Sequence, residues 1–127
     1  MRTLRLVKFD PATNTATRYW ETNGFRSCDS LAVEELTPEQ QAAVEGALNW
    51  AAGRLPTGFN ALEMVELQRL SNVEVASEDP ESDPVLIPAF AAGITGRGES
   101  GERSLEIFSA PGPETAALGQ LWDELSV

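Results

Sequence analysis

The strongest local signal in this chain is a helix start at Thr37-Pro38-Glu39-Gln40, around which the rest of the fold must pack. Thr37 can accept a hydrogen bond from the first helical turn, Pro38 suits the first helical position, and Gln40 can bond back to the cap. Apolar residues then follow at helical spacing: Val44, Ala47, Leu48, Ala51 and Leu55. Since Gly53 and Pro56 end the pattern, we predict a helix over residues 38–53.

Two runs rich in β-branched and aromatic residues precede this helix. They span residues 4–9 and 15–21 and flank the turn-forming sequence Asp10-Pro11-Ala12-Thr13-Asn14. This pattern predicts a β-hairpin. The next turn signal is Asn23-Gly24.

Residues 60–76 fit two patterns. Asn60 and Glu63 imitate a capping box, and Phe59 with Met64 could form a hydrophobic staple, which indicates a helix. However, apolar residues from 61 to 70 would surround such a helix on all sides. In a strand, four apolar side chains share one face: Val65, Leu67, Val73 and Val75. We therefore favour a strand here.

The last third of the chain predicts two strands and a helix. Residues 77–84 read as a polar loop, and Val85–Ile94 as a buried strand that Pro88 places at a sheet edge or a bulge. A glycine-rich turn leads to a short strand over 104–108. A helix from about Glu114 carries one apolar face: Leu118, Leu121, Trp122 and Leu125. At about 12 residues it is too short to be stable alone, so it must dock.

The predicted element order is β-β-α-β-β-β-α. A mostly antiparallel sheet of about five strands with two helices packed on one face satisfies it, which is an α+β fold. The length of 127 residues fits a single domain over 1–127. No apolar run approaches a membrane span, and the N-terminus lacks the apolar stretch of a secretory signal. We therefore expect a cytoplasmic protein that does not bind membranes.

The chain contains no histidine and a single cysteine, Cys28. Triads and metal sites that depend on histidine are therefore excluded, and so is an internal disulfide. Cys28 has no histidine to activate it, so we interpret it as structural or tolerated. We expect no metal and no cofactor, and a non-enzymatic role is favoured. An enzyme that uses only carboxylates and arginine remains open.

Charge is distributed unevenly along the chain, whose net charge is −11. Residues 1–28 hold two acidic groups against five basic ones: Arg2, Arg5, Lys8, Arg18 and Arg26. The rest holds eighteen acidic groups against four basic ones: Arg54, Arg69, Arg97 and Arg103. Such a field repels phosphate backbones and attracts basic proteins. It predicts no direct binding to nucleic acid and a basic protein as partner.

Residues 96–101 match the pattern G-x-G-x-x-G, but the residues that follow read as a strand. A dinucleotide site would need a helix there, so we interpret the glycines as a hairpin turn. A weaker alternative is an anion site that uses Arg97 and Arg103.

The loop Ser77–Pro84 carries four acidic residues: Glu78, Asp79, Glu81 and Asp83. It lacks the glycine and the final glutamate of a calcium-binding EF-hand loop. We predict that these four residues bind a basic partner, with Trp122, Asp123 and Glu124 as a second group of contacts.

The leading functional hypothesis is a non-enzymatic, acidic protein-binding module. It is comparable in charge and size to small inhibitors, immunity proteins and nucleic-acid mimics. Two alternatives stay open. One is a structural or assembly subunit, such as a homo-oligomer or a phage-type component that associates through an exposed edge strand near Val85–Ile94 or through the C-terminal helix. The other is a small-ligand or anion-binding domain.

Overall fold

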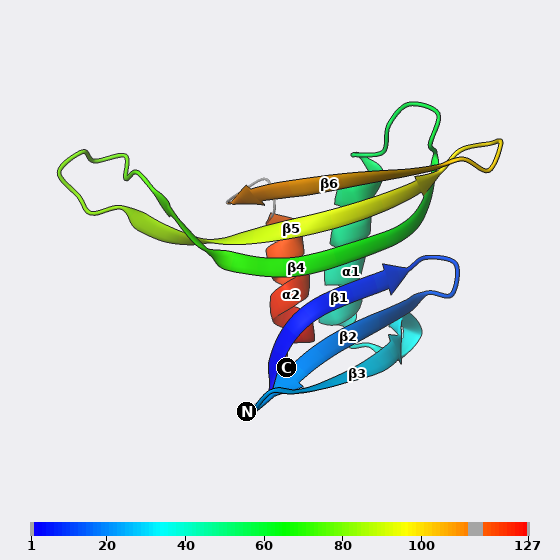
Figure 1. Ribbon diagram of the computed structural model, residues 1–127, viewed down its shortest axis with the longest axis horizontal. Coiled ribbons are helices and arrows are strands. Elements are labelled where there is room, and N and C mark those ends of the chain that lie inside the picture. The colour runs from blue at the N-terminus through cyan, green and yellow to red at the C-terminus, as the bar shows by residue number, and fades with distance from the viewer. Residues whose placement is uncertain (1, 112–115, 127) are drawn as a thin grey trace.

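One antiparallel sheet of six strands, backed by two helices, forms the architecture of the protein (Figure 1). The computed structural model describes residues 2–111 and 116–126, without the side chains of 71, 73, 75, 87, 88 and 108–111. The elements are β1 (Thr3–Asp10), β2 (Thr15–Thr22), β3 (Phe25–Ala32), a 3₁₀ turn (Val33–Glu35), α1 (Pro38–Ala52), β4 (Ala61–Val75), β5 (Val85–Arg97), β6 (Arg103–Pro111) and α2 (Ala116–Leu125). The predicted α+β class is confirmed, with β3 as an additional strand.

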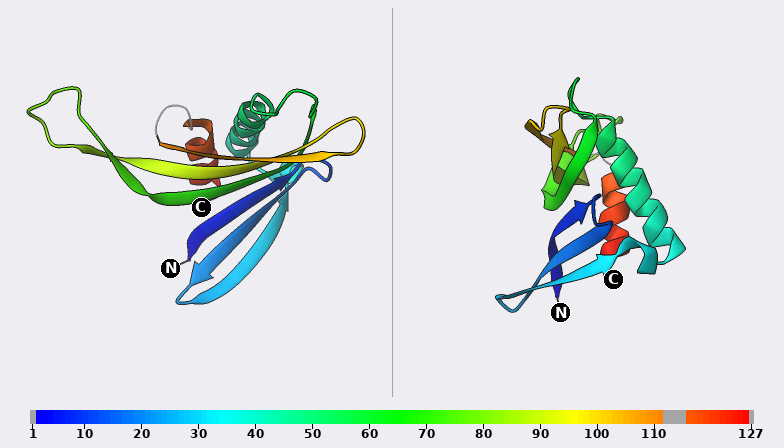
Figure 2. Two further views of the ribbon diagram at one scale, coloured as in Figure 1. Left: turned by 45° about the horizontal axis from the view of Figure 1, so that its top comes forward. Right: turned by 90° about the vertical axis from the view of Figure 1, so that its right-hand side faces the viewer.

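The strand order is β3-β2-β1-β4-β5-β6. It consists of two three-stranded meanders, β1–β3 and β4–β6, which meet where β1 pairs with β4. That seam is three residue pairs long and joins Val7–Phe9 to Val65–Leu67. Away from the seam the two meanders diverge (Figure 2).

The predicted capping box opens α1. Gln40 donates its backbone N–H to the Thr37 hydroxyl at 3.1 Å, and Thr37 donates its own N–H to the Gln40 side chain at 3.0 Å. The helix ends at Ala52, and Gly53 caps it. Its buried face carries mostly alanines, which bring α2 close. The side-chain amide of Gln40 donates to the Glu124 carbonyl at 3.1 Å and ties the two helices together.

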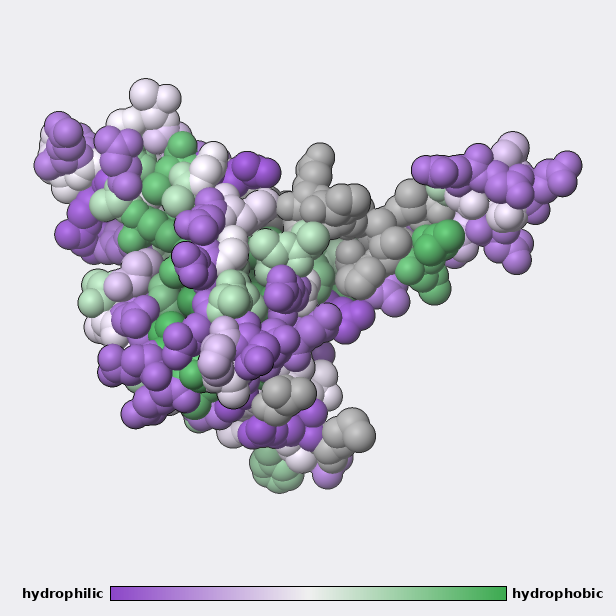
Figure 3. Space-filling view, turned by 180° about the vertical axis from the view of Figure 1, so that it is seen from behind, coloured by the Kyte–Doolittle hydropathy of each residue, from purple (hydrophilic) through white to green (hydrophobic). Residues whose placement is uncertain are grey.

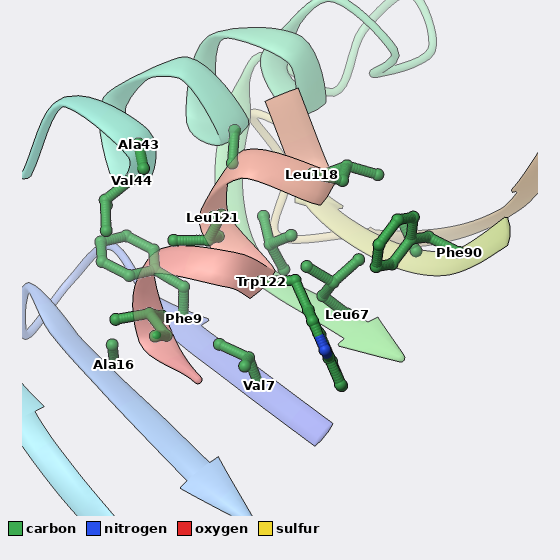
Figure 4. Close-up of a cluster of buried hydrophobic side chains, with 14 of the residues drawn as sticks. Val7, Phe9, Ala16, Ala43, Val44, Leu67, Phe90, Leu118, Leu121 and Trp122 are labelled. Carbon is green, nitrogen blue, oxygen red and sulfur yellow. The ribbon is translucent and has the colours of Figure 1, made fainter. Parts of the chain in front are cut away.

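The hydrophobic core lies between the helices and one face of the sheet (Figure 4). The sheet contributes Val7, Phe9 and Leu67, among others, and α2 contributes the predicted apolar face: Leu118, Leu121, Trp122 and Leu125. Each fully buried side chain of this size stabilises the fold by about 1.5–3 kcal/mol. The expected helix start at Glu114 lies outside the described residues.

Residues 61–75 form a strand, which confirms the interpretation favoured for residues 60–76. Its β-bulges explain why the alternation of apolar and polar residues is irregular. The register shifts between Leu62 and Met64 and again between Leu70 and Val73. Val65 and Leu67 between these shifts face the core, as predicted. The predicted inward side chains of Val73 and Val75 lie outside the description.

The strand predicted over Val85–Ile94 is confirmed, and it is largely buried from Ala89 to Ile94. The register shift between Leu70 and Val73 of β4 places a bulge opposite Pro88, one of the two outcomes that the proline indicated. The sheet edges are β3 and β6, so the alternative of an exposed edge strand near Val85–Ile94 is wrong from Ala89 onward. From Ala89 to Arg97, β5 is paired with β4 on one side and β6 on the other. Only Val85–Ile87 pairs with β4 alone. Within the described residues, neither helix is long and apolar enough to cross a membrane.

Candidate functional site

The hairpin of β4 and β5 extends beyond the rest of the sheet as an arm, which we define as residues 71–88. Pairing of β5 with β6 ends at Ala89, while pairing of β5 with β4 continues to Val85. The arm therefore consists of two strands, whereas from Ala89 onward β5 is paired with β4 on one side and with β6 on the other. Figure 1 shows it reaching away from both helices, with the loop that joins its strands at the tip.

The four predicted acidic residues lie at this tip, and all are exposed: Glu78, Asp79, Glu81 and Asp83. The Asp79 carboxylate orders the loop because it accepts hydrogen bonds from the Glu81 N–H at 3.0 Å and the Ser82 hydroxyl at 3.2 Å. Within the described part of the chain, none of the four forms an ion pair. Their charges are therefore directed to solvent.

Apolar surface adjoins the acidic tip. At the start of β5, directly after the tip loop, Val85 is 52% exposed and Leu86 is 59% exposed. The space-filling view shows a hydrophobic patch on the arm beside the hydrophilic tip (Figure 3). The arm thus presents charged and apolar surface side by side.

The second predicted group of contacts does not join the first. Trp122 is only 4% exposed, and its ring centroid lies 6.0 Å from that of Phe90 in the core. A surface role for Trp122 therefore disagrees with its position. Asp123 is exposed and Glu124 half-buried on α2, which lies behind the sheet, whereas the acidic tip lies at the far end of the arm (Figure 1).

Arg97 and Arg103 do lie together, at the β5–β6 turn, but a carboxylate of the protein already binds them. Each guanidinium approaches the same Oε1 atom of Glu63 at 2.9 Å. The glycine pattern forms the turn itself, with Gly98 N–H bonded to the Glu102 carbonyl at 2.8 Å and Gly101 at φ 86°. Glu63 therefore takes the place that the predicted anion would occupy.

Arginines also gather in a place that the sequence did not indicate. Where β1 and β4 diverge, Arg5, Arg26 and Arg69 line one hollow of about 410 Å³. They come from β1, β3 and β4, so only the fold brings them together. The excess of basic residues in the first 28 positions was the one signal that could have located this hollow.

Across the described ranges, no group of three or more His, Cys, Asp or Glu side chains could hold a metal ion. Cys28 is exposed on β3. Comparison of the chain with protein-family models, with curated proteins and with solved structures finds no match.

Proposed function

We propose that this protein is a non-enzymatic, cytoplasmic binding module whose arm engages a basic protein partner. The observation that supports the proposal is the position of the four tip carboxylates, which project on a two-stranded ribbon beyond the sheet and have no ion-pair partner within the described residues. Inhibitors, immunity proteins and nucleic-acid mimics use negative surfaces in this way.

The arm has no evident role in holding the fold together. None of its described side chains belongs to the hydrophobic core. An isolated two-stranded ribbon is at best marginally stable in water. The arm, which extends away from the helices and the rest of the sheet, therefore adds little to the stability of the fold. Clustered, projecting charges do accelerate association with an oppositely charged partner. Binding to a partner accounts both for the projection of the arm away from the core and for the cluster of charges at its tip.

The exposed apolar residues give such a complex a means of persisting. Electrostatic attraction mainly raises the association rate, whereas apolar burial slows dissociation. Val85 and Leu86 would provide that burial next to the charged tip. We therefore expect the partner to place basic residues against the tip and an apolar residue against the adjoining strand residues Val85 and Leu86.

Capture of interactors from a lysate of the native host would test this proposal. The wild-type protein is immobilised beside a tip variant (Glu78→Gln, Asp79→Asn, Glu81→Gln, Asp83→Asn) and a matched control. The control removes four exposed charges elsewhere: Glu34→Gln, Glu35→Gln, Glu45→Gln and Glu99→Gln. Bound protein is released by raising salt from about 0.05 M to about 0.5 M, which shortens the Debye length about threefold.

A basic protein retained by the wild type and the control, but not by the tip variant, would support the proposal. Equal retention by the tip variant would remove the arm from the interface. Retention that is lost equally in both variants would mean that net charge alone, and not the arm, attracts the partner.

A second function, assembly of several copies, is favoured by the edge strand β6. Leu105 is 64% exposed and Ile107 is 71% exposed on β6, whose outer edge pairs with no further strand of the described residues. Exposed, apolar edge strands promote pairing between chains. Light scattering across a range of concentrations tests this alternative: the mass should rise with concentration, and Ile107→Lys should prevent the rise.

A further inference from the structure

The hollow between the diverging meanders, which we call the wedge, is distinct from the arm tip. Its lining comes from β1 to β4 and includes Arg5, Leu6, Tyr19, Glu21, Arg26 and Arg69. A second hollow of about 430 Å³ adjoins it and shares Leu4, Arg5 and Arg69. The volume of about 410 Å³ lies within the range of about 300–1,000 Å³ typical of small-molecule sites.

The wedge is locally positive on a strongly negative protein. Three arginines face one carboxylate there, that of Glu21, which binds the Arg5 guanidinium at 2.9 Å. Neither Arg26 nor Arg69 forms an ion pair with a described carboxylate. By contrast, Lys8 forms an ion pair with Glu66 and Arg18 with Asp29. Convergent guanidinium groups without matching carboxylates are typical of an anion site.

A β-bulge helps to form the site. Leu4 pairs with Trp20 and Leu6 with Tyr19, so Arg5 is the extra residue of β1. Bulges redirect a side chain and are over-represented next to functional sites. Arg2 lines the adjoining hollow, and its guanidinium lies 4.0 Å from the centroid of the Trp20 ring, which adds positive charge beside the wedge.

We infer that the wedge binds a small organic anion, with its carboxylate or phosphate group held by Arg26 and Arg69 and its apolar part against Leu6 and Tyr19. An extended peptide fits less well, because the bulge at Arg5 in the β1–β2 pair makes the backbone of β1 irregular beside the wedge, and because β1 and β4 pair only over Val7–Phe9 and then diverge. The planar guanidinium group of arginine can donate paired hydrogen bonds to a carboxylate or to a phosphate.

The test is a titration of the isotope-labelled protein, followed by NMR, with phenyl phosphate, benzoate and phenol. Phenol carries the ring without the charge. We expect saturable shifts of amides in β1, β3 and β4 around the wedge, with a Kd below about 1 mM for at least one of the two anions. The anion with the lower Kd shows whether the site prefers a carboxylate or a phosphate. No response is expected from phenol.

Two variants with equal charge changes locate the binding. Arg26→Gln with Arg69→Gln should weaken the affinity at least tenfold, while Arg97→Gln with Arg103→Gln should preserve it. All four arginines are exposed, so both variants should fold, and the dispersion of their spectra checks this.

Three results would overturn the inference. They are the absence of saturable binding by either anion, binding that survives Arg26→Gln with Arg69→Gln, and phenol binding as well as the anions do. Much tighter binding of a hexaglutamate peptide at the same residues would also overturn it and assign the wedge to an acidic protein segment. Because the arm tip takes no part, these results are independent of the capture experiment.

Discussion

The Arg18 guanidinium on β2 donates two hydrogen bonds to the Asp29 carboxylate on β3 and a third, at 3.1 Å, to the Leu125 carbonyl at the end of α2. The Trp20 indole N–H also donates to Asp29, at 3.2 Å. Arg18 is largely buried, and its guanidinium forms an ion pair with this carboxylate. One ion pair therefore connects two strands of the first meander to the C-terminal helix.

Replacing Asp29 by Asn should destabilise the protein by about 2 kcal/mol, because the buried Arg18 guanidinium would lose the carboxylate that accepts two of its hydrogen bonds. The figure is below that for a fully buried pair, since solvent reaches part of the Asp29 carboxylate. Thermal unfolding should show a loss of about 8 °C in Tm. Asp123→Asn, which removes an exposed carboxylate on α2, is the control and should leave Tm almost unchanged.

The same pair predicts how stability depends on pH. Hydrogen bonds from Arg18 hold the pKa of Asp29 below its ordinary value, partial burial opposes them, and Trp20 and the charges of Arg18 and Arg2 assist. The unfolded chain, with a pKa of about 3.9 at this position, therefore binds the proton more tightly. The stability difference between wild type and Asp29→Asn should be full at neutral pH and shrink as pH falls below about 4. A difference that stays constant down to pH 2 would contradict this coupling.

The capping box predicts a cost at the start of α1. Thr37→Ala removes the acceptor for the Gln40 N–H and should lower the free energy of unfolding by about 1 kcal/mol. Thr57→Ala, at an exposed loop position, should change it by less than about 0.5 kcal/mol. Urea denaturation of the two variants makes the comparison, and equal stabilities would argue against the cap.

The burial of Trp122 predicts a large loss on truncation. Trp122→Ala should destabilise the fold by about 3–5 kcal/mol because it leaves a cavity against Phe90. Gln120→Ala, on the exposed side of the same helix, should lie within about 0.5 kcal/mol of wild type. Chemical denaturation measures both. Nearly native stability of Trp122→Ala would contradict the burial of this residue and would support its predicted role as a partner contact.

The arm should be removable without unfolding the body. Leu70 and Ala89 are cross-strand partners, so an Asn-Gly turn can replace residues 71–88 between them. Because no described arm residue lies in the core, Tm should stay within about 5 °C of wild type. Circular dichroism during heating checks this, and loss of a cooperative transition would show that the arm supports the fold.

Local chemistry explains which elements the sequence predicted well. The first hairpin, α1 and α2 each have a pattern complete within the element itself, and β4 kept a readable alternation between its bulges. β3 was missed because Phe25–Ala32 shows little alternation and Phe25 itself is exposed. Its inward residue Asp29 is a charged group, whose partner Arg18 is known only once the strands pair.

The candidate sites divide in the same way. The acidic tip could be predicted because its four carboxylates are contiguous in sequence. The environments of Arg97 and Trp122 could not, since each depends on a distant residue, Glu63 or Phe90. The wedge was beyond prediction because three separate strands supply its arginines, and the divergence that opens it is a property of the whole sheet.

The short seam between the meanders has a consequence for how the chain folds. Every strand pair except β1–β4 joins consecutive strands, so each meander can form by closing short loops, at low entropic cost. The seam offers too few backbone hydrogen bonds to unite them, and that step needs the apolar faces of α1 and α2. We therefore expect a late transition state in which both meanders have formed and the two helices are packing onto the face of the sheet that the meanders share. Substitutions at the seam and in the helices should then slow folding most, while substitutions in the arm should leave the folding rate unchanged.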